Sequence, residues 1–183
     1  MVLFADWTLL RLFPPLRAMW ALAGRSATVP ISGANARRVL CGAITLATAR
    51  RAVLVRRTAG QADAQAFLRD LRRRYRRAGI LWLFLDRASA HTAPATQRVA
   101  ATLGIVLLWL PKQHPELNPM DHLWRELKRL IAANRQAESI DALADDATAW
   151  VRALTPAEAR RKSGMAAEDF WLGHLLQDFW PST

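Results

Sequence analysis

Hydrophobic residues fall along the chain in short runs that predict several buried strands. Residues 80–85 (ILWLFL) and 105–110 (IVLLWL) are apolar at every position, which is typical of strands covered by helices on both faces. Residues 2–6 (VLFAD) predict a buried strand that ends in a carboxylate and leads into an irregular, proline-containing stretch. Residues 36–46 and 50–57 predict a hairpin whose strands carry basic residues at their ends.

The remaining segments predict helices. Phe67, Leu71 and Tyr75 recur every four residues within residues 61–78 and mark the buried stripe of a helix that Gly79 ends. Further helices are expected at residues 93–103, 119–134, 139–154 and 156–163. This order of strands and helices predicts an α/β fold with a mixed sheet flanked by helices.

Composition narrows the class of partner. The chain has 183 residues, 52% of them hydrophobic, and a formal net charge of +11. This length suits a single domain, and the charge favours a polyanion as the partner, either nucleic acid or an anionic membrane surface.

The apolar runs are too short to cross a bilayer. The N-terminal run is interrupted by Asp6 and Arg11 and does not have the pattern of a signal peptide. Cys41 is the only cysteine, which excludes an internal disulfide and fits a cytoplasmic location. Nucleic acid is the expected partner, and no membrane partner is expected.

Three carboxylates are candidates for the chemistry. Asp6 and Asp86 each follow a predicted buried strand, and the sites of α/β sheets form in the crevice beyond strand ends. Either aspartate is equally well explained as an ordinary turn residue. Asp121, at the start of the helix at residues 119–134, is the third. Oxygen ligands without a nearby cysteine or histidine cluster suit Mg²⁺ or Mn²⁺, and such sites commonly carry out phosphoryl transfer.

Asp121 also has two structural interpretations. Asn118 is a favoured N-cap residue and Pro119 suits the first helical position. Asp121 then stands third, where its carboxylate can accept from the backbone N–H of the cap. The alternative is an i,i+4 ion pair with Arg125. A metal role is compatible with capping, because a carboxylate has two oxygens.

A longer pattern surrounds these residues. His91 follows Asp86 closely, the loop at residues 115–119 reads PELNP, and an apolar–tryptophan pair, Leu123 and Trp124, follows Asp121. Thirty-four residues separate Asp86 from Asp121. Residues 86–129 thereby closely resemble the catalytic core of bacterial insertion-sequence transposases, in the mariner-like branch of the DDE superfamily.

The resemblance implies a ribonuclease-H-like (retroviral-integrase-like) core, expected at residues 1–165. An aromatic tail at residues 166–183 is expected to pack on the core or extend from it. By the same resemblance, Asp6, Asp86 and Asp121 bind two Mg²⁺ or Mn²⁺ ions, cleave DNA at transposon ends and join those ends to target DNA. A homodimer on DNA is implied. So is a helix-turn-helix module from an upstream reading frame, because the DNA-reading domains of the family precede the core and Met1 lies close to Asp6.

Cationic residues near the carboxylates are the expected DNA contacts: Arg87, His91, Lys112, Arg125, Lys128 and Arg129. Trp124, Leu127 and Ile131 share the buried face of their helix, so its basic residues face outward. The alternative to a DNA contact is that this outward face is simply exposed to solvent. An equally good interpretation of His91 is a polar residue whose hydrogen bonds are made within its own turn, without a DNA contact. The arginine-rich helix at residues 61–78 has a membrane-surface interpretation, which its narrow apolar stripe disfavours.

Some residues depart from the family pattern. Asp121 stands where many relatives have glutamate, Arg87 where asparagine is common, and Trp7 where glutamate often follows the first aspartate. Trp7 and the missing DNA-reading domains support an alternative function, a non-catalytic DNA-binding relic or a truncated inhibitor of a full-length transposase. A phosphatase of the haloacid-dehalogenase type is disfavoured, because its pattern needs an aspartate where Thr8 stands.

Overall fold

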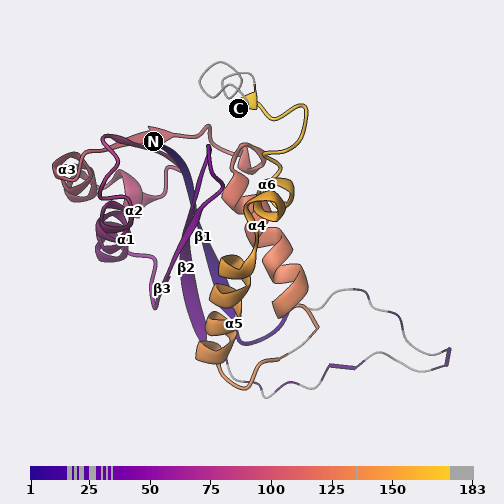
Figure 1. Cartoon of the computed structure of the whole chain (residues 1–183). Helices are drawn as coiled ribbons and strands as arrows, with labels where there is room; N and C mark the ends of the chain where they lie inside the picture. Colours follow the sequence, from indigo (N-terminus) through magenta and orange to yellow (C-terminus); the bar gives the residue numbers. More distant parts are fainter. Residues whose placement is uncertain are drawn as a thin grey trace.

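The fold is described from a computed structural model of the chain (Figure 1). The structure describes residues 1–15, 18, 20, 23–24, 28–29, 31, 33, 35–134 and 136–173. Within these residues, five strands form one sheet in the order β3-β2-β1-β4-β5. The strands are β1 (Val2–Arg11), β2 (Arg37–Thr45), β3 (Arg51–Arg56), β4 (Leu81–Leu85) and β5 (Ile105–Trp109). β1, β2 and β3 pair antiparallel, whereas β1, β4 and β5 run parallel. The predicted mixed sheet is confirmed.

β1 is longer than the sequence predicted. Instead of ending at Asp6 it continues to Arg11, because β2 pairs with it as far as Arg11↔Arg37. The parallel pairing with β4 stops earlier, at Phe4↔Phe84. Residues 5–11 therefore have a neighbouring strand on one side only among the described strands. Asp6 lies just beyond the point where the parallel part of the sheet ends.

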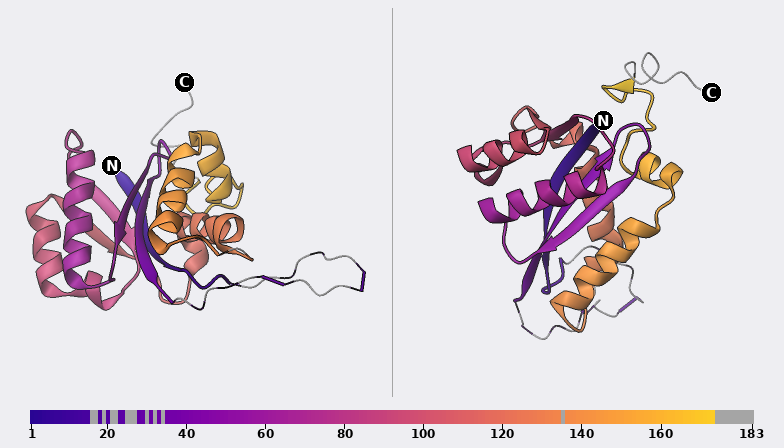
Figure 2. Two further views of the ribbon diagram at one scale, coloured as in Figure 1. Left: turned by 90° about the horizontal axis from the view of Figure 1, so that it is seen from below. Right: turned by 60° about the vertical axis from the view of Figure 1, so that its left-hand side comes forward.

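Helices cover both faces of the sheet, as predicted (Figures 1 and 2). One face carries α1 (Gln61–Arg74), α2 (Ser89–Thr92) and α3 (Pro94–Thr102), and the other carries α4 (Pro119–Leu127), α5 (Ile140–Ala153) and α6 (Pro156–Lys162). The sheet thus separates two hydrophobic cores. One is built around Leu3, Phe67 and Leu71, and the other around Phe4 and Trp124.

Two helix predictions need correction, and two short elements were missed. α1 ends four residues early, because the Arg72 guanidinium donates to the carbonyl oxygens of Tyr75, Ala78 and Gly79 and closes a non-helical turn there. α4 is shorter than expected and passes into a π-helical segment, η2 (Lys128–Ala132). The short α2 and the 3₁₀ turn η1 (Pro115–Leu117) were not predicted, since neither is long enough to show a period.

The expectation that both faces of β4 are covered by helices is wrong on one face. Trp82 in β4 remains 41% exposed, because α4 and α5 lie over the antiparallel strands and β1. Trp171 packs edge-on against Phe4 and against Phe84 of β4. Part of the expected aromatic tail thus packs on the core, and residues 174–183 lie outside the described residues.

None of the helices in the described part of the chain has the length and apolarity needed to cross a membrane.

Candidate active site

Three carboxylates from separate elements line one cavity. Asp6 lies on β1, Asp86 directly follows β4, and Asp121 is the third residue of α4. All three line a cavity of about 470 Å³. The structure therefore brings together the three aspartates that the sequence selected.

Asp6 is partly buried. Its pKa is raised to about 7, first because burial disfavours the charged form and next because of the negative charge on Asp121. Asp86 raises this pKa further, whereas the backbone N–H of Trp7 and the charge of Lys128 lower it. The carboxylates thus repel one another, and a cation between them would stabilise their charged forms.

Asn118 fixes α4 in place. Its side-chain oxygen accepts from the Met120 backbone N–H (3.1 Å), which is the predicted N-cap. Its Nδ2 also donates to the backbone carbonyl oxygen of Ala5 in β1 (2.9 Å). A second tether comes from Trp124, whose Nε1 donates to the carbonyl oxygen of Asp6 (3.3 Å). The helix that carries Asp121 is therefore bonded to the strand that carries Asp6.

The side chain of Asp121 is not used as a cap. The backbone N–H of Asn118 donates instead to the Pro115 carbonyl oxygen (3.0 Å). Asp121 forms the other contact considered for it, an ion pair in which Arg125 Nε lies 3.0 Å from its Oδ2. Arg125 is 59% exposed, and exposed pairs of this kind contribute little to stability.

Gly42 allows α4 to approach the sheet. It pairs directly with Asp6 in the register of β1 and β2. A Cβ at this position would lie 2.3 Å from Trp124 Cζ2 and 2.6 Å from Met120 Cε, closer than atoms can pack. The sequence around Gly42 does not indicate this role, because Met120 and Trp124 are distant in the chain.

His91 supports Asp86. Its Nδ1 lies 2.7 Å from Asp86 Oδ1, and this hydrogen bond, assisted by one from the backbone N–H of Ala88, holds the pKa of Asp86 below its ordinary value. The residue is 5% exposed, and its ring packs edge-on against Trp7, with centroids 4.6 Å apart. His91 does not line the cavity of the carboxylates. The structure therefore disfavours the expected DNA contact and favours the alternative of a histidine satisfied within its turn.

The other expected DNA contacts are distributed unevenly. Arg87 and Lys112 line the cavity, whereas Arg129 makes two hydrogen bonds to Glu126 (2.9 and 3.0 Å). Lys128 lies in a neighbouring hollow. The cavity lining also includes Gln113 and His114, neither of which was among the expected DNA contacts. The sequence feature that could have indicated these two lining residues is their position just before the PELNP loop.

The donor set fits a hard divalent cation. Within the described parts of the chain, no three His, Cys, Asp or Glu side chains are already close enough to enclose an ion. However, Asp86 uses Oδ1 for its contacts with His91 and Ala88, and Asp121 uses Oδ2 for Arg125. Asp86 and Asp121 thus each keep a second oxygen for a ligand. Carboxylates around one cavity are the ligands that Mg²⁺ and Mn²⁺ prefer.

A five-stranded mixed sheet with carboxylates on β1, after β4 and on α4 defines the ribonuclease-H-like class of catalytic cores. The chain belongs to the DDE superfamily endonuclease family, whose model matches residues 1–144.

Known proteins agree with this assignment. A 39 kDa protein of insertion element IS630 from Shigella sonnei is 25% identical over 156 residues, which cover 85% of this chain and 46% of that protein. The chain therefore spans about half the length of this curated relative. A Mos1 transposase paired-end complex with the left transposon end is 20% identical, with a TM-score of 0.71 over 93% of this chain and 53% of that one. The catalytic domain of Mos1 mariner transposase is 19% identical, with a TM-score of 0.65 over 93% of this chain and 78% of that one. The predicted family and ribonuclease-H-like fold are confirmed.

Proposed function

We propose that this chain is the catalytic core of a transposase, which cleaves DNA at transposon ends and joins those ends to target DNA. The observation that carries the proposal is that Asp6, Asp86 and Asp121, from three separate elements, line one cavity. The formal net charge of +11 supplies the attraction for a polyanionic substrate. The family assignment supports the same reaction class.

In this proposal the three aspartates, a DDD variant of the family's acidic triad, are the metal ligands. When bound, two Mg²⁺ or Mn²⁺ ions activate a water or a 3′-hydroxyl for in-line attack and stabilise the leaving oxygen. Solved structures of the Mos1 catalytic domain with Mg and with Mn support this choice of metals. His91 orients the Asp86 carboxylate, and Arg87 and Lys112 attract the phosphate to the cavity.

The proposal includes a homodimer on paired DNA ends. It also includes end recognition by a helix-turn-helix module from an upstream reading frame, as the resemblance to insertion-sequence transposases implies. The paired-end complex of Mos1 transposase supports the paired arrangement. The core itself is expected to contact phosphates with little preference for sequence.

The test is Mn²⁺-dependent nicking of supercoiled DNA by the wild-type chain, Asp86→Asn and Asp145→Asn. Asp145 is an exposed residue of α5, so its substitution matches the change of charge away from the cavity. We expect Asp86→Asn to lose nicking and keep DNA binding, and Asp145→Asn to behave like the wild type. Wild-type nicking by Asp86→Asn contradicts the proposed site. Binding without any nicking by the wild-type chain favours the alternative, a non-catalytic DNA-binding relic or inhibitor.

A further inference from the structure

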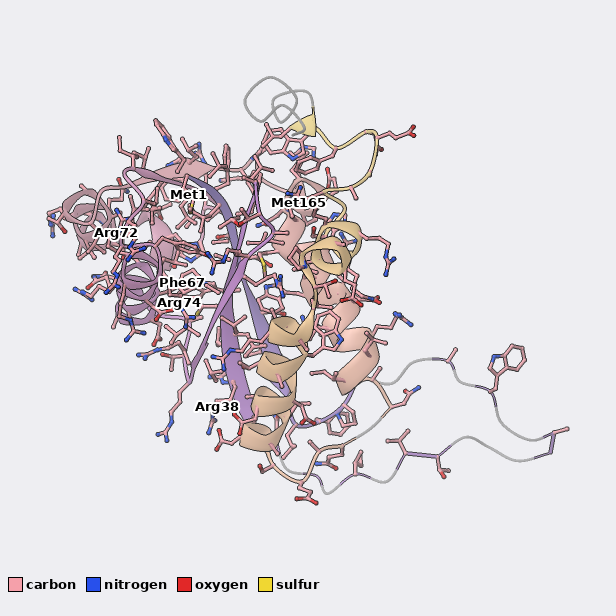
Figure 3. All side chains as sticks on the ribbon, viewed as in Figure 1. Met1, Arg38, Phe67, Arg72, Arg74 and Met165 are labelled. Carbon is pink, nitrogen blue, oxygen red and sulfur yellow. The ribbon has the colours of Figure 1, made fainter. Side chains whose placement is uncertain are left out.

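The arginine-rich helix α1 lies on the far side of the sheet from the cavity of the three carboxylates. Side chains alternate along β1, so Asp6 leaves the same face as Phe4, and Phe4 packs in one core with Trp124 of α4. α1 covers the opposite face, where Figure 3 shows Arg72 and Arg74. Phosphate contacts at the cavity are therefore expected from the residues that line it.

One of these lining residues, His114, is held by a carboxylate that does not itself line the cavity. His114 Nδ1 lies 2.8 Å from Glu116 Oε1, and this hydrogen bond is the main reason why the pKa of Glu116 lies below its ordinary value. At neutral pH the carboxylate is ionised and can only accept, so Nδ1 is the donor. The other ring nitrogen, Nε2, makes no hydrogen bond with the residues that the structure describes.

The backbone holds both members of this pair in place. Glu116 lies in η1, and its carbonyl oxygen accepts from His122 Nε2 of α4 (3.1 Å). Directly before His114, Gln113 has a φ of 64°, a left-handed conformation that residues other than glycine rarely adopt. Such a conformation persists where the surroundings impose it, and it often occurs at binding sites. The loop therefore presents His114 to the cavity from a preformed position.

We propose that His114, oriented by Glu116, donates a hydrogen bond from Nε2 to a phosphate oxygen of the DNA bound in the cavity. The inference rests on the proposed function and adds a substrate contact to the same site. With Nδ1 bonded to Glu116, Nε2 donates only from the charged ring, which an adjacent phosphate stabilises. The ring then bridges a fixed carboxylate and the substrate, and it holds the phosphate in place relative to Asp6, Asp86 and Asp121.

The experiment measures Mn²⁺-dependent nicking of supercoiled DNA at saturating protein by His114→Gln, His114→Asn and His114→Ala. The amide nitrogen of His114→Gln reaches about as far as Nε2, whereas that of His114→Asn reaches only as far as Nδ1. We expect His114→Gln to retain much of the rate and the other two to lose about tenfold, as the loss of a hydrogen bond to a charged group predicts. A wild-type rate for His114→Ala overturns the inference. An equal loss by all three variants also overturns it, because an amide can replace a donor but not a base.

Glu116→Gln tests the orientation of the ring. Removal of a negative charge near the cavity should by itself strengthen DNA binding. We nevertheless expect Glu116→Gln to nick more slowly, because Nδ1 then bonds a neutral amide, and to bind DNA at least as tightly as the wild type. In a double-mutant cycle, Glu116→Gln should have no further effect on nicking when His114→Ala is already present. An equal effect in both backgrounds contradicts the orienting role, since Glu116 would then act independently of His114.

Glu168→Gln is the matched control for the change of charge, because Glu168 is an exposed residue after α6. It should nick at the wild-type rate. The side chains of His114 and Glu116 are both more than half exposed, so substitutions at either position should leave the melting temperature nearly unchanged. A lowered melting temperature that accounts for the lost nicking overturns the inference.

A measurement that does not depend on nicking separates this inference from the proposed function. The NMR signal of the His114 ring, assigned with His114→Gln, is followed while a short DNA duplex is added in Mg²⁺. It should move, and by more than the signal of His122, which does not line the cavity. A His114 signal that stays in place overturns the contact, and if the wild-type chain nicks DNA, the catalytic assignment still stands. If the signal moves but the wild-type chain does not nick, His114 contacts DNA on a chain that lacks the proposed activity.

Discussion

The side chain of Asn118 donates to the backbone carbonyl oxygen of Ala5 across 2.9 Å, and this bond joins α4 to β1 beside the candidate catalytic residues. The same amide accepts from Met120 N–H and caps the helix. Asn118 is 4% exposed, and Ala5 lies just past the end of the pairing between β1 and β4. One buried amide thus begins the helix and sets its distance from the strand.

Substitutions at Asn118 should separate these two tasks. Asn118→Ser keeps a capping acceptor but is too short to reach Ala5, so a buried carbonyl oxygen loses its donor at a cost of about 1–3 kcal/mol. Asn118→Ala loses the cap as well, about 1 kcal/mol more. Urea denaturation should show this order, and both variants should nick DNA more slowly than the wild type. Unchanged nicking by Asn118→Ser would mean that the tether does not position Asp121.

Gly42→Ala should destabilise the fold by about 1–3 kcal/mol through overpacking, because the new methyl group would collide with Trp124 and Met120. Combining it with Trp124→Phe should recover part of that loss, as a double-mutant cycle measures. Gly79→Ala is the control, since a Cβ there meets nothing within 4 Å. Equal stability of Gly42→Ala and Gly79→Ala contradicts the close approach.

The sequence predicted most of the elements and the three carboxylates, but less of what positions them. Apolar runs and helical periods report on each segment by itself, which is sufficient to find β4, β5 and the start of α4. They do not report which strands pair, so Asp6 was expected at a strand end although β2 extends β1 to Arg11. The role of Gly42 depends on Trp124, far along the chain. The second hydrogen bond of Asn118 was hidden for the same reason.

His91 should affect catalysis through Asp86 rather than through DNA binding. His91→Asn retains a donor near the position of Nδ1, whereas His91→Phe retains the ring against Trp7 but has no donor. We expect His91→Asn to keep more nicking activity than His91→Phe, with similar DNA affinity for both. The reverse order would show that packing on Trp7, and not the hydrogen bond to Asp86, is the important contact.

Glu126 should make a stabilising contribution that depends on pH. Its carboxylate contacts Arg129 and, at 3.0 Å, Lys162 of α6, and the hydrogen bonds from these two residues lower its pKa to about 2. Since the folded pKa lies below the unfolded value of about 4.3, the contribution is full above that value and is lost as the pH falls toward 2. The group is partly exposed, so solvent screening limits the effect to about 1 kcal/mol or less.

The measurement is the difference in unfolding free energy between the wild type and Glu126→Gln at pH 7, 5 and 3. That difference should be similar at pH 7 and 5 and smaller at pH 3. Glu168→Gln, at an exposed residue after α6, is the control and should show little difference at any of these pH values. A Glu126→Gln effect that is the same at pH 7 and pH 3 would assign it to packing instead of charge.

Asp121→Asn should remove Mn²⁺-dependent nicking at a nearly unchanged melting temperature. The amide preserves the shape of the side chain. The ion pair that it loses is with an exposed partner and contributes only about 0.3–0.5 kcal/mol. Arg125→Gln removes the same ion pair but keeps the carboxylate, so at saturating DNA it should retain nicking.

Asp121→Glu keeps the charge and adds a methylene group. It should recover little activity, because Mg²⁺ tolerates little change in ligand position. Asp121 is held at one distance from Asp6 by Asn118 and Trp124, which leaves a longer side chain little freedom to adjust. Nicking by Asp121→Asn at the wild-type rate would reduce Asp121 to the ion-pair partner of Arg125, and Asp6 and Asp86 would then need a different third ligand.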